Sequence, residues 1–264
     1  MTLKLNPLTC EPPAEVPLPR APLIRVIAQV RFPLIVAVEL REFVAPFQEA
    51  IRKQYPVLRQ EQTQTMVMTP NGITPSAPHV AWKFSDLQGH WRVSLASDFL
   101  AIETSLYTNR ADFFSRFKQL LVALNEHVQP SVIDRLGVRY VNRVVGAELK
   151  EIASLVQPQV LGIIGTDAVE QVQSSLTESR FTVAPGQVLA RWGYLPKGAT
   201  FDPSVIEQAE EPCWILDVDM FTAQQQAFDP DRVLQDAKQF AERIYAIFRW
   251  AVTPQFLQAY GGNV

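Results

Sequence analysis

Residues 24–32 read Ile-Arg-Val-Ile-Ala-Gln-Val-Arg-Phe, with apolar side chains at nearly every second position. Such alternation is typical of a β-strand that buries one face and leaves the other polar. Pro33 ends the pattern, because proline has no N–H to donate to a central strand. The apolar face would carry Ile24, Val26, Ala28, Val30 and Phe32, and the polar face Arg25, Gln29 and Arg31.

The last three residues of this strand have a counterpart in the middle of the chain. Val30-Arg31-Phe32 is matched by Val138-Arg139-Tyr140, and each triplet precedes a helix-like stretch, a run of strands and a long amphipathic helix. We therefore predict an α+β fold built from a duplicated strand, helix, antiparallel meander and helix, with the helices packed on one face of a mainly antiparallel sheet. The alternative is one continuous α+β sheet in which this order arises twice by chance.

Periodicity and turn residues divide the chain into a proline-rich arm over 1–22 and two repeats over 23–130 and 131–264, packed as one globular unit. The first repeat is expected to hold a helix over 40–54, strands near 65–69, 80–84, 91–95 and 100–106, and a helix from the N-cap Asn109 to about 128. The second is expected to hold a short helix over 148–156, strands over 169–183, 186–196 and 214–220, a helix opening at Asp229-Pro230, and a last helix after Pro254.

Composition is that of an ordinary soluble globular protein. The 264 residues are 47% hydrophobic and 19% charged, and the net charge of -3 gives no overall attraction to nucleic acid or anionic lipid. No run approaches the roughly 18 apolar residues that a membrane span needs, and the arm contains no signal-like apolar stretch. The two cysteines, Cys10 and Cys213, form no recognisable disulfide or zinc pattern, which is typical of a reducing compartment. The sequence therefore predicts a cytoplasmic location, and the lack of a long apolar run predicts no membrane partner.

Charged residues on the polar faces of the predicted strands form the candidate site. The opening strand of each repeat carries arginines, and the last strand of each meander carries carboxylates, so charges of both signs would project from the face opposite the helices. Such a face could bind a partner or an anionic ligand, although solvent-facing strands are commonly charged for no other reason than contact with water. The candidate binding residues are Arg31, Arg92, Glu103, Arg139, Arg143, Asp217 and Asp219.

Metal and cofactor chemistry has weak support in the sequence. Asp217 and Asp219 could hold Mg²⁺ or Ca²⁺ together with Glu103, but alternating carboxylates are common on exposed strands. The three histidines have neither zinc-ligand nor triad spacing. Tryptophans in the strand patterns share a side with apolar residues, which favours core packing over base or sugar stacking. The sequence thus predicts no metal, no cofactor and no recognisable catalytic residue.

Several short motifs resemble a sporadically distributed prokaryotic family of proteins of about 250 residues. They are Pro22-Leu23-Ile24 leading into Val30-Arg31-Phe32, the central segment 139–143, Leu216-Asp217-Val218-Asp219, and the closing helix through Phe248 to Thr253-Pro254. The resemblance covers nearly the whole chain, and no activity is assigned to that family. Its patchy distribution implies an accessory role, in a defence or toxin–antitoxin setting, more than a role in central metabolism.

Two functions remain open from the sequence. The first is a cytoplasmic, non-catalytic binding protein whose sheet face or proline-rich arm recognises another macromolecule. The second is a metal-assisted enzyme that acts on a small anionic or phosphorylated substrate. The expected partners are a protein, a small anionic ligand or a second copy of the chain, and the overall charge disfavours nucleic acid.

Overall fold

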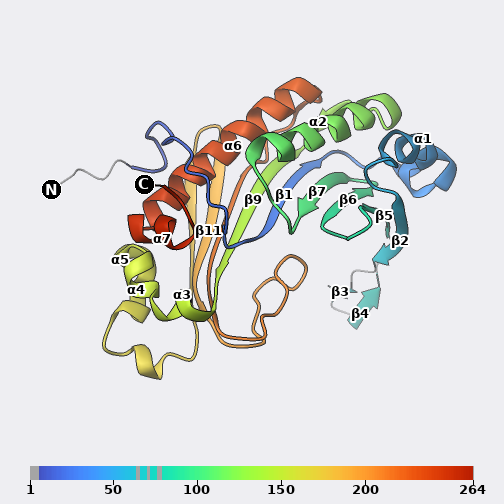
Figure 1. The fold of residues 1–264 in the computed structure, drawn as a ribbon. Coiled ribbons are helices and arrows are strands. Elements are labelled where there is room, and N and C mark those ends of the chain that lie inside the picture. Colours follow the sequence, from blue (N-terminus) through green and yellow to red (C-terminus); the bar gives the residue numbers. More distant parts are fainter. Residues whose placement is uncertain (1–5, 64–65, 70–71, 76–78, 264) are drawn as a thin grey trace. The chain divides into compact units, whose positions relative to one another are not determined.

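The computed structural model describes residues 6–63, 66–69, 72–75 and 79–263 (Figure 1). It is a mixed α/β structure with a large antiparallel sheet of nine strands in the order β10-β11-β12-β9-β1-β7-β6-β5-β2. The strands are β1 (Leu23–Arg31), β2 (Val57–Thr63), β5 (His79–Ser85), β6 (Trp91–Ala96), β7 (Phe99–Thr104), β9 (Arg135–Val144), β10 (Ser175–Val183), β11 (Gly186–Leu195) and β12 (Cys213–Thr222).

Seven α-helices and two small strand pairs complete the described part of the chain. The pairs are β3 (Met66–Thr69) with β4 (Gly72–Pro75), and β8 (Val132–Ile133) with β13 (Gln226–Ala227). Three single turns of 3₁₀ helix are η1 (Val36–Glu39), η2 (Gly162–Gly165) and η3 (Val169–Gln171). The α-helices are α1 (Arg41–Ile51), α2 (Arg110–His127), α3 (Gly146–Lys150), α4 (Ile152–Leu155), α5 (Pro158–Leu161), α6 (Pro230–Ala251) and α7 (Pro254–Ala259).

The chain forms two compact units, each made of stretches that are not contiguous in the sequence. Unit 1 comprises Met1–Val26, Val138–Thr222 and Lys238–Val264, and unit 2 comprises Ile27–Gly137 and Ala223–Ala237. Unit 1 thus includes the N-terminal arm, and unit 2 includes the start of α6. The units follow the chain differently from the predicted ranges 23–130 and 131–264.

Unit 2 is built around aromatic contacts between its strands and two helices. The Phe47 ring of α1 lies 5.8 Å from that of Phe84 on β5, and the Trp91 ring of β6 lies 5.9 Å from that of Phe113 on α2. The apolar stripe predicted for α2, residues 113–124, is buried, and Asn109 caps the helix by accepting a hydrogen bond from the Asp112 N–H at 2.9 Å. These features confirm the sequence-based assignment of this helix.

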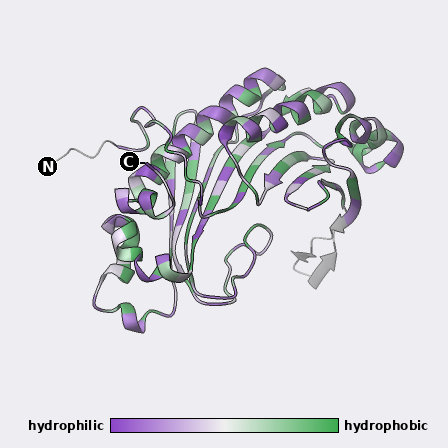
Figure 2. Ribbon diagram, viewed as in Figure 1, coloured by the Kyte–Doolittle hydropathy of each residue, from purple (hydrophilic) through white to green (hydrophobic). Residues whose placement is uncertain are grey.

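Unit 1 packs the second half of α6 and all of α7 with the strands β9 to β12. The predicted stripe of α6 is buried from Val233 to Phe248, and Figure 2 shows hydrophobic and hydrophilic residues alternating around this helix. Asp229 caps α6 by accepting hydrogen bonds from the N–H groups of Asp231 and Arg232. No helix in the described part of the chain has the length and apolar character needed to cross a bilayer.

Several sequence-based boundaries were wrong for identifiable reasons. β2 was not predicted, because Val57–Thr63 is mostly polar and an outermost strand needs little apolar alternation. The strand expected at 65–69 belongs to the separate β3/β4 pair, and residue 65 lies outside the described residues. The helix expected over 148–156 is divided between α3 and α4, and β10 begins at Ser175 because η3 and a short coil occupy 169–174.

The cap of α2 provides a test of the fold. Asn109→Ala removes the side-chain acceptor for the Asp112 N–H and should lower the free energy of unfolding by about 1 kcal/mol. Urea titration followed by circular dichroism would measure the change, and amide exchange in the first turn of α2 would locate it. Asn109→Asp, which keeps a capping oxygen, should retain most of the stability. Equal stability of all three proteins would contradict the role of the cap.

Candidate functional site

A row of alternating charges crosses four strands of unit 1. In the strand register, Glu178 of β10 lies opposite Arg191 of β11, and Arg191 lies opposite Asp217 of β12. Arg139 of β9 binds the same Asp217 carboxylate. We call Glu178, Arg191, Asp217 and Arg139 the charge ladder. The alternation of side chains along each strand brings these residues to one face of the sheet.

The Arg139–Asp217 pair is the centre of the charge ladder. Arg139 donates from Nε to Asp217 Oδ1 at 2.7 Å and from Nη2 to Oδ2 at 2.8 Å, which is the bidentate geometry of a strong arginine–carboxylate pair. The side chains are 14% and 2% exposed, so the carboxylate lies in the protein interior. Arg139 Nη1 donates to Asp202 Oδ2 at 2.7 Å. Arg139 therefore uses all three of its nitrogens within the protein.

Arg191 connects this buried pair to the edge of the sheet. Its Nε donates to Glu178 Oε2 at 2.8 Å, and its Nη1 lies 3.5 Å from Asp217 Oδ2. The guanidinium carbon also lies 5.4 Å from the centre of the Phe201 ring. Glu178 is 43% exposed, and Arg180, two residues along the same strand, donates to it at 3.4 Å. The charge ladder is thus buried at Asp217 and exposed at its other end, Glu178 of β10.

The segment 196–212, which joins β11 to β12 and is orange in Figure 1, covers part of the same face. We call it the covering segment. Its Ile206 and Ala209 pack in a buried cluster with Val141 of β9 and Ile215 of β12. Because Asp217 and Ile215 share a side of β12, the covering segment lies on the face that carries the charge ladder. The polar face of unit 1 is therefore partly covered and not open to solvent throughout.

Polar contacts attach the covering segment at several points. Arg25 Nη2 of β1 lies 3.1 Å from Glu207 Oε1, and the Arg25 side chain is only 7% exposed. Arg143 donates to the Glu207 carbonyl, and the Thr200 hydroxyl donates to the Ile206 carbonyl at 2.8 Å. Asp202, bound to Arg139, completes the attachment. The arginines of β1 and β9 therefore hold this connection against the sheet.

Local charges shift the pKa of three groups here. Burial would raise the pKa of Asp202, but hydrogen bonds from Ser204 and Arg139 outweigh it and hold that pKa below its ordinary value. Burial would likewise lower the pKa of Arg139, but Asp217 and Asp202 together raise it. The hydrogen bond from Arg191 lowers the pKa of Glu178. All three groups are therefore charged at neutral pH.

The predicted site residues divide between the two units. Arg139 and Asp217 meet in the charge ladder, whereas Arg143 binds the covering segment and Asp219 lies opposite Leu189 of β11. In unit 2, Arg31 forms an ion pair with Asp98 on the β6–β7 turn. The remaining two predicted residues of unit 2, Arg92 and Glu103, lie opposite each other on β6 and β7 and form an ion pair at 3.7 Å.

Sequence reasoning missed two members of this network. The residues around Glu178 show little alternation of apolar and polar side chains, because β10 is an outer strand with mostly exposed side chains. Nothing in the pattern therefore assigned Glu178 to a particular face of the sheet. Asp202 lies in the covering segment, 63 residues from Arg139, and no local pattern predicts such a pairing. Arg191 was not among the predicted binding residues either.

Metal binding finds no geometric support in the described residues. Among them, no group of three or more histidine, cysteine, aspartate or glutamate side chains could hold a metal ion. Both Asp217 oxygens accept hydrogen bonds from Arg139, which leaves this carboxylate poorly suited to a cation.

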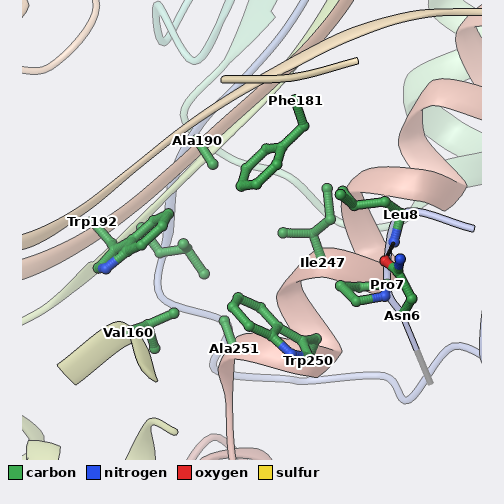
Figure 3. A pocket seen from close by; sticks show the side chains of 11 residues that line it. Asn6, Pro7, Leu8, Val160, Phe181, Ala190, Trp192, Ile247, Trp250 and Ala251 are labelled. Carbon is green, nitrogen blue, oxygen red and sulfur yellow. Dashed lines mark hydrogen bonds between the residues drawn. The ribbon is translucent and has the colours of Figure 1, made fainter. Parts of the chain in front are cut away.

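On the other face of the same strands, unit 1 contains a cavity of about 230 Å³ (Figure 3). Trp192 of β11, Leu216 of β12 and Trp250 of α6 are among its walls. Figure 3 shows the rings of Phe181, Trp192 and Trp250 arranged around it, with Pro7 and Leu8 of the N-terminal arm on the opposite side. The full lining is Asn6, Pro7, Leu8, Val160, Phe181, Ala190, Trp192, Leu216, Ile247, Trp250 and Ala251.

No protein-family model matches this chain, and no curated protein matches it at a significant level. The site must therefore be interpreted from its own geometry.

Removing one partner of the buried pair should destabilise unit 1 strongly. Asp217→Asn leaves two arginines without their shared anion in a poorly solvated position, so the free energy of unfolding should fall by about 3 kcal/mol or more. Urea titration of the wild-type chain and the variant would measure this loss of unfolding free energy. The double variant Arg139→Met/Asp217→Leu, which removes both charges, should lose much less. A loss from Asp217→Asn no larger than that from the exposed Glu178→Gln would contradict this interpretation.

The lowered pKa of Asp202 predicts a specific dependence on pH. Its ordinary value is 3.8 and the folded value is lower, so its contribution to stability is complete above about pH 4 and is lost as pH falls through the folded pKa. The difference in unfolding free energy between the wild-type chain and Asp202→Asn should therefore be constant near neutral pH and shrink below pH 4. Urea titrations across this range would measure it, and a difference that grows on acidification would contradict the assignment.

Proposed function

We propose that this chain is a non-catalytic binding protein that works as a homodimer joined along β10. The observation that carries the proposal is the charge ladder, which ends in a partly exposed carboxylate on an outermost strand. Three features of β10 favour such a dimer: its place in the sheet, its exposure and its charge order.

β10 has the properties of an open edge. It is the terminal strand of the sheet order, and no described strand pairs with its outer side. It is nine residues long, and most of its side chains are exposed, including Leu176 at 41%. A long edge strand offers a row of backbone donors and acceptors to another chain, and strand addition is a common mode of protein recognition.

The charge order of β10 favours a second copy of the same strand. If two β10 strands pair antiparallel about a two-fold axis at Ser179, Glu178 of one copy lies opposite Arg180 of the second copy, and the reverse pair forms at the same time. Each opposite-charge pair across strands contributes roughly 0.2 to 1 kcal/mol. This pairing would extend the alternation of Arg191 and Glu178 into the second copy, and such an interface is self-complementary, as two-fold dimers require.

An internal duplication accounts for the order of the strands. We propose that β1, β7, β6 and β5 correspond to β9, β12, β11 and β10. In both series the opening strand neighbours the last strand of its own meander, and a long helix, α2 or α6, follows that last strand.

In unit 2 the ring contacts of α1 and α2 fall on the side of Phe84 and Trp91, and in unit 1 α6 lines the cavity opposite the charge ladder. Both observations support helices on one face.

The wider role remains a proposal that rests on the resemblance of the sequence motifs. We propose a cytoplasmic protein, accessory to a defence or toxin–antitoxin system, in which the dimer holds a protein partner or a small anionic ligand. Arg31, Arg92, Glu103, Arg143 and Asp219 remain candidates for that contact. The metal-assisted enzyme has no described cluster of ligands to support it, so we do not favour it.

Charge reversal on β10 tests the dimer directly. The wild-type chain should have the mass of a dimer by size-exclusion chromatography with light scattering. Arg180→Glu places glutamates opposite each other across the axis, and Glu178→Arg places arginines opposite each other, so each variant alone should be monomeric. An equimolar mixture of the two should recover the dimer mass, because the pairs become complementary again.

A matched control is Lys238→Glu, an exposed charge reversal on the part of α6 that belongs to unit 1, which should remain dimeric. A monomeric wild-type chain, or single variants that remain dimeric, would contradict the proposal. Circular dichroism of each variant would show that its fold is retained.

A further inference from the structure

We propose that the cavity of unit 1 is a binding site for a small, uncharged molecule with one or two aromatic or aliphatic rings, and that the N-terminal arm is its lid. This inference does not depend on the dimer, because the cavity and the charge ladder lie on opposite faces of the strands.

The chemistry of the walls defines the class of ligand. Three aromatic rings and several aliphatic side chains surround the space, and no charged side chain lines it. A charged ligand would lose its hydration there without gaining a partner, which excludes ions. Aromatic rings prefer stacked or edge-to-face contacts with other rings, and Phe181, Trp192 and Trp250 offer such surfaces from two directions (Figure 3).

The volume sets the size of the ligand. Apolar cavities of about 150 Å³ hold benzene, so a cavity of about 230 Å³ fits a molecule of one substituted ring or two fused rings. The cavity exists because two of its lining residues have small side chains. Ala190 on β11 and Ala251 on α6 both line it and are almost fully buried. A partly open pocket of this size, lined by aromatic and aliphatic side chains, has the form of a small-molecule binding site.

The arm closes one side of the cavity through contacts with α6. Arg243 Nη1 donates to the carbonyl oxygens of Pro7 at 2.9 Å and Cys10 at 2.7 Å. Further along the arm, the Val16 N–H donates to the Tyr245 hydroxyl at 2.7 Å. One guanidinium therefore holds the arm residues that adjoin the cavity. Because the described part of the arm, residues 6–22, belongs to no strand of the sheet, it can detach without breaking any strand pairing.

The proline content of the arm suits this role. Pro7, Pro12 and Pro13 restrict the backbone, so docking the arm costs less conformational entropy than docking a flexible tail. Pro7 itself presents an apolar ring to the cavity (Figure 3). Contacts between the ligand and Pro7 or Leu8 would stabilise the docked arm, so ligand binding and arm docking should strengthen each other.

The test uses the full chain and the neutral fluorescent probe 1-naphthylamine, whose two fused rings match the size of the cavity. The wild-type chain should bind one probe saturably, with increased probe emission and energy transfer from tryptophan. Ala190→Leu fills the cavity and should weaken binding at least tenfold. Ala223→Leu makes the same change at an exposed position outside the lining and should bind like the wild-type chain. If Ala190→Leu does not fold, Ala251→Val fills the space from the helix side and should give the same loss.

A second variant tests the lid. Arg243→Met removes the donor to Pro7 and Cys10 but keeps the apolar stem, so probe affinity should fall several-fold and the arm should become more sensitive to limited proteolysis. Probe should protect the arm of the wild-type chain from cleavage. Absence of saturable probe binding, or equal binding by the wild-type chain and both cavity-filling variants, would overturn the binding site. Unchanged affinity in Arg243→Met would overturn the lid.

The outcome is separable from that of the proposed dimer. Ala190→Leu and Arg243→Met should keep the wild-type oligomeric mass, whereas Arg180→Glu should bind the probe normally. Loss of probe binding with an intact dimer would contradict the cavity proposal alone, and a monomeric wild-type chain that binds the probe would contradict the dimer alone.

Discussion

A buried carboxylate in the middle of a sheet imposes a strict condition on everything around it. Asp217 is 1% exposed, so its charge must be matched by donors that the protein itself supplies. Arg139 and Arg191 meet this condition from the two neighbouring strands. Because side chains alternate, a shift of one residue between β12 and either neighbour would move the arginine to the other face and leave Asp217 unpaired. The ion pairs thereby fix the register of three strands.

The same condition explains the position of the covering segment. Arg139 has a third nitrogen directed away from Asp217, and Asp202 of the covering segment accepts its hydrogen bond. Apolar residues of this segment then pack on β9 and β12, so the charged pair and the small apolar cluster support each other. A buried ion pair is weak evidence for stability by itself, but it is effective at selecting one arrangement among several. The charge ladder is best understood as a structural device that is most exposed at Glu178 on β10.

The sequence predicted the parts of this structure that depend on short-range patterns. The strand over 24–32, the Asn109 cap and the stripe of α6 follow from alternation, capping chemistry and helical spacing, all of which are local. The sequence also identified Arg139 and Asp217 as candidates, because both stand at polar positions of well-patterned strands. It could not pair them, nor include Asp202, because contacts between residues 63 and 78 positions apart depend on strand order and on the path of a loop. The cavity was equally hidden, since alanines at 190 and 251 are unremarkable in any sequence.

Strand alternation also determines how the surfaces of unit 1 relate to one another. Along β10, Phe181 lines the cavity while Glu178 and Arg180 belong to the opposite face. A substitution on the cavity face therefore does not touch the charged face, and the reverse also holds. For this reason the ligand site and the β10 dimer can be tested separately. The backbone of β10 nevertheless belongs to both faces. Any coupling between the cavity and the edge would have to pass through this backbone.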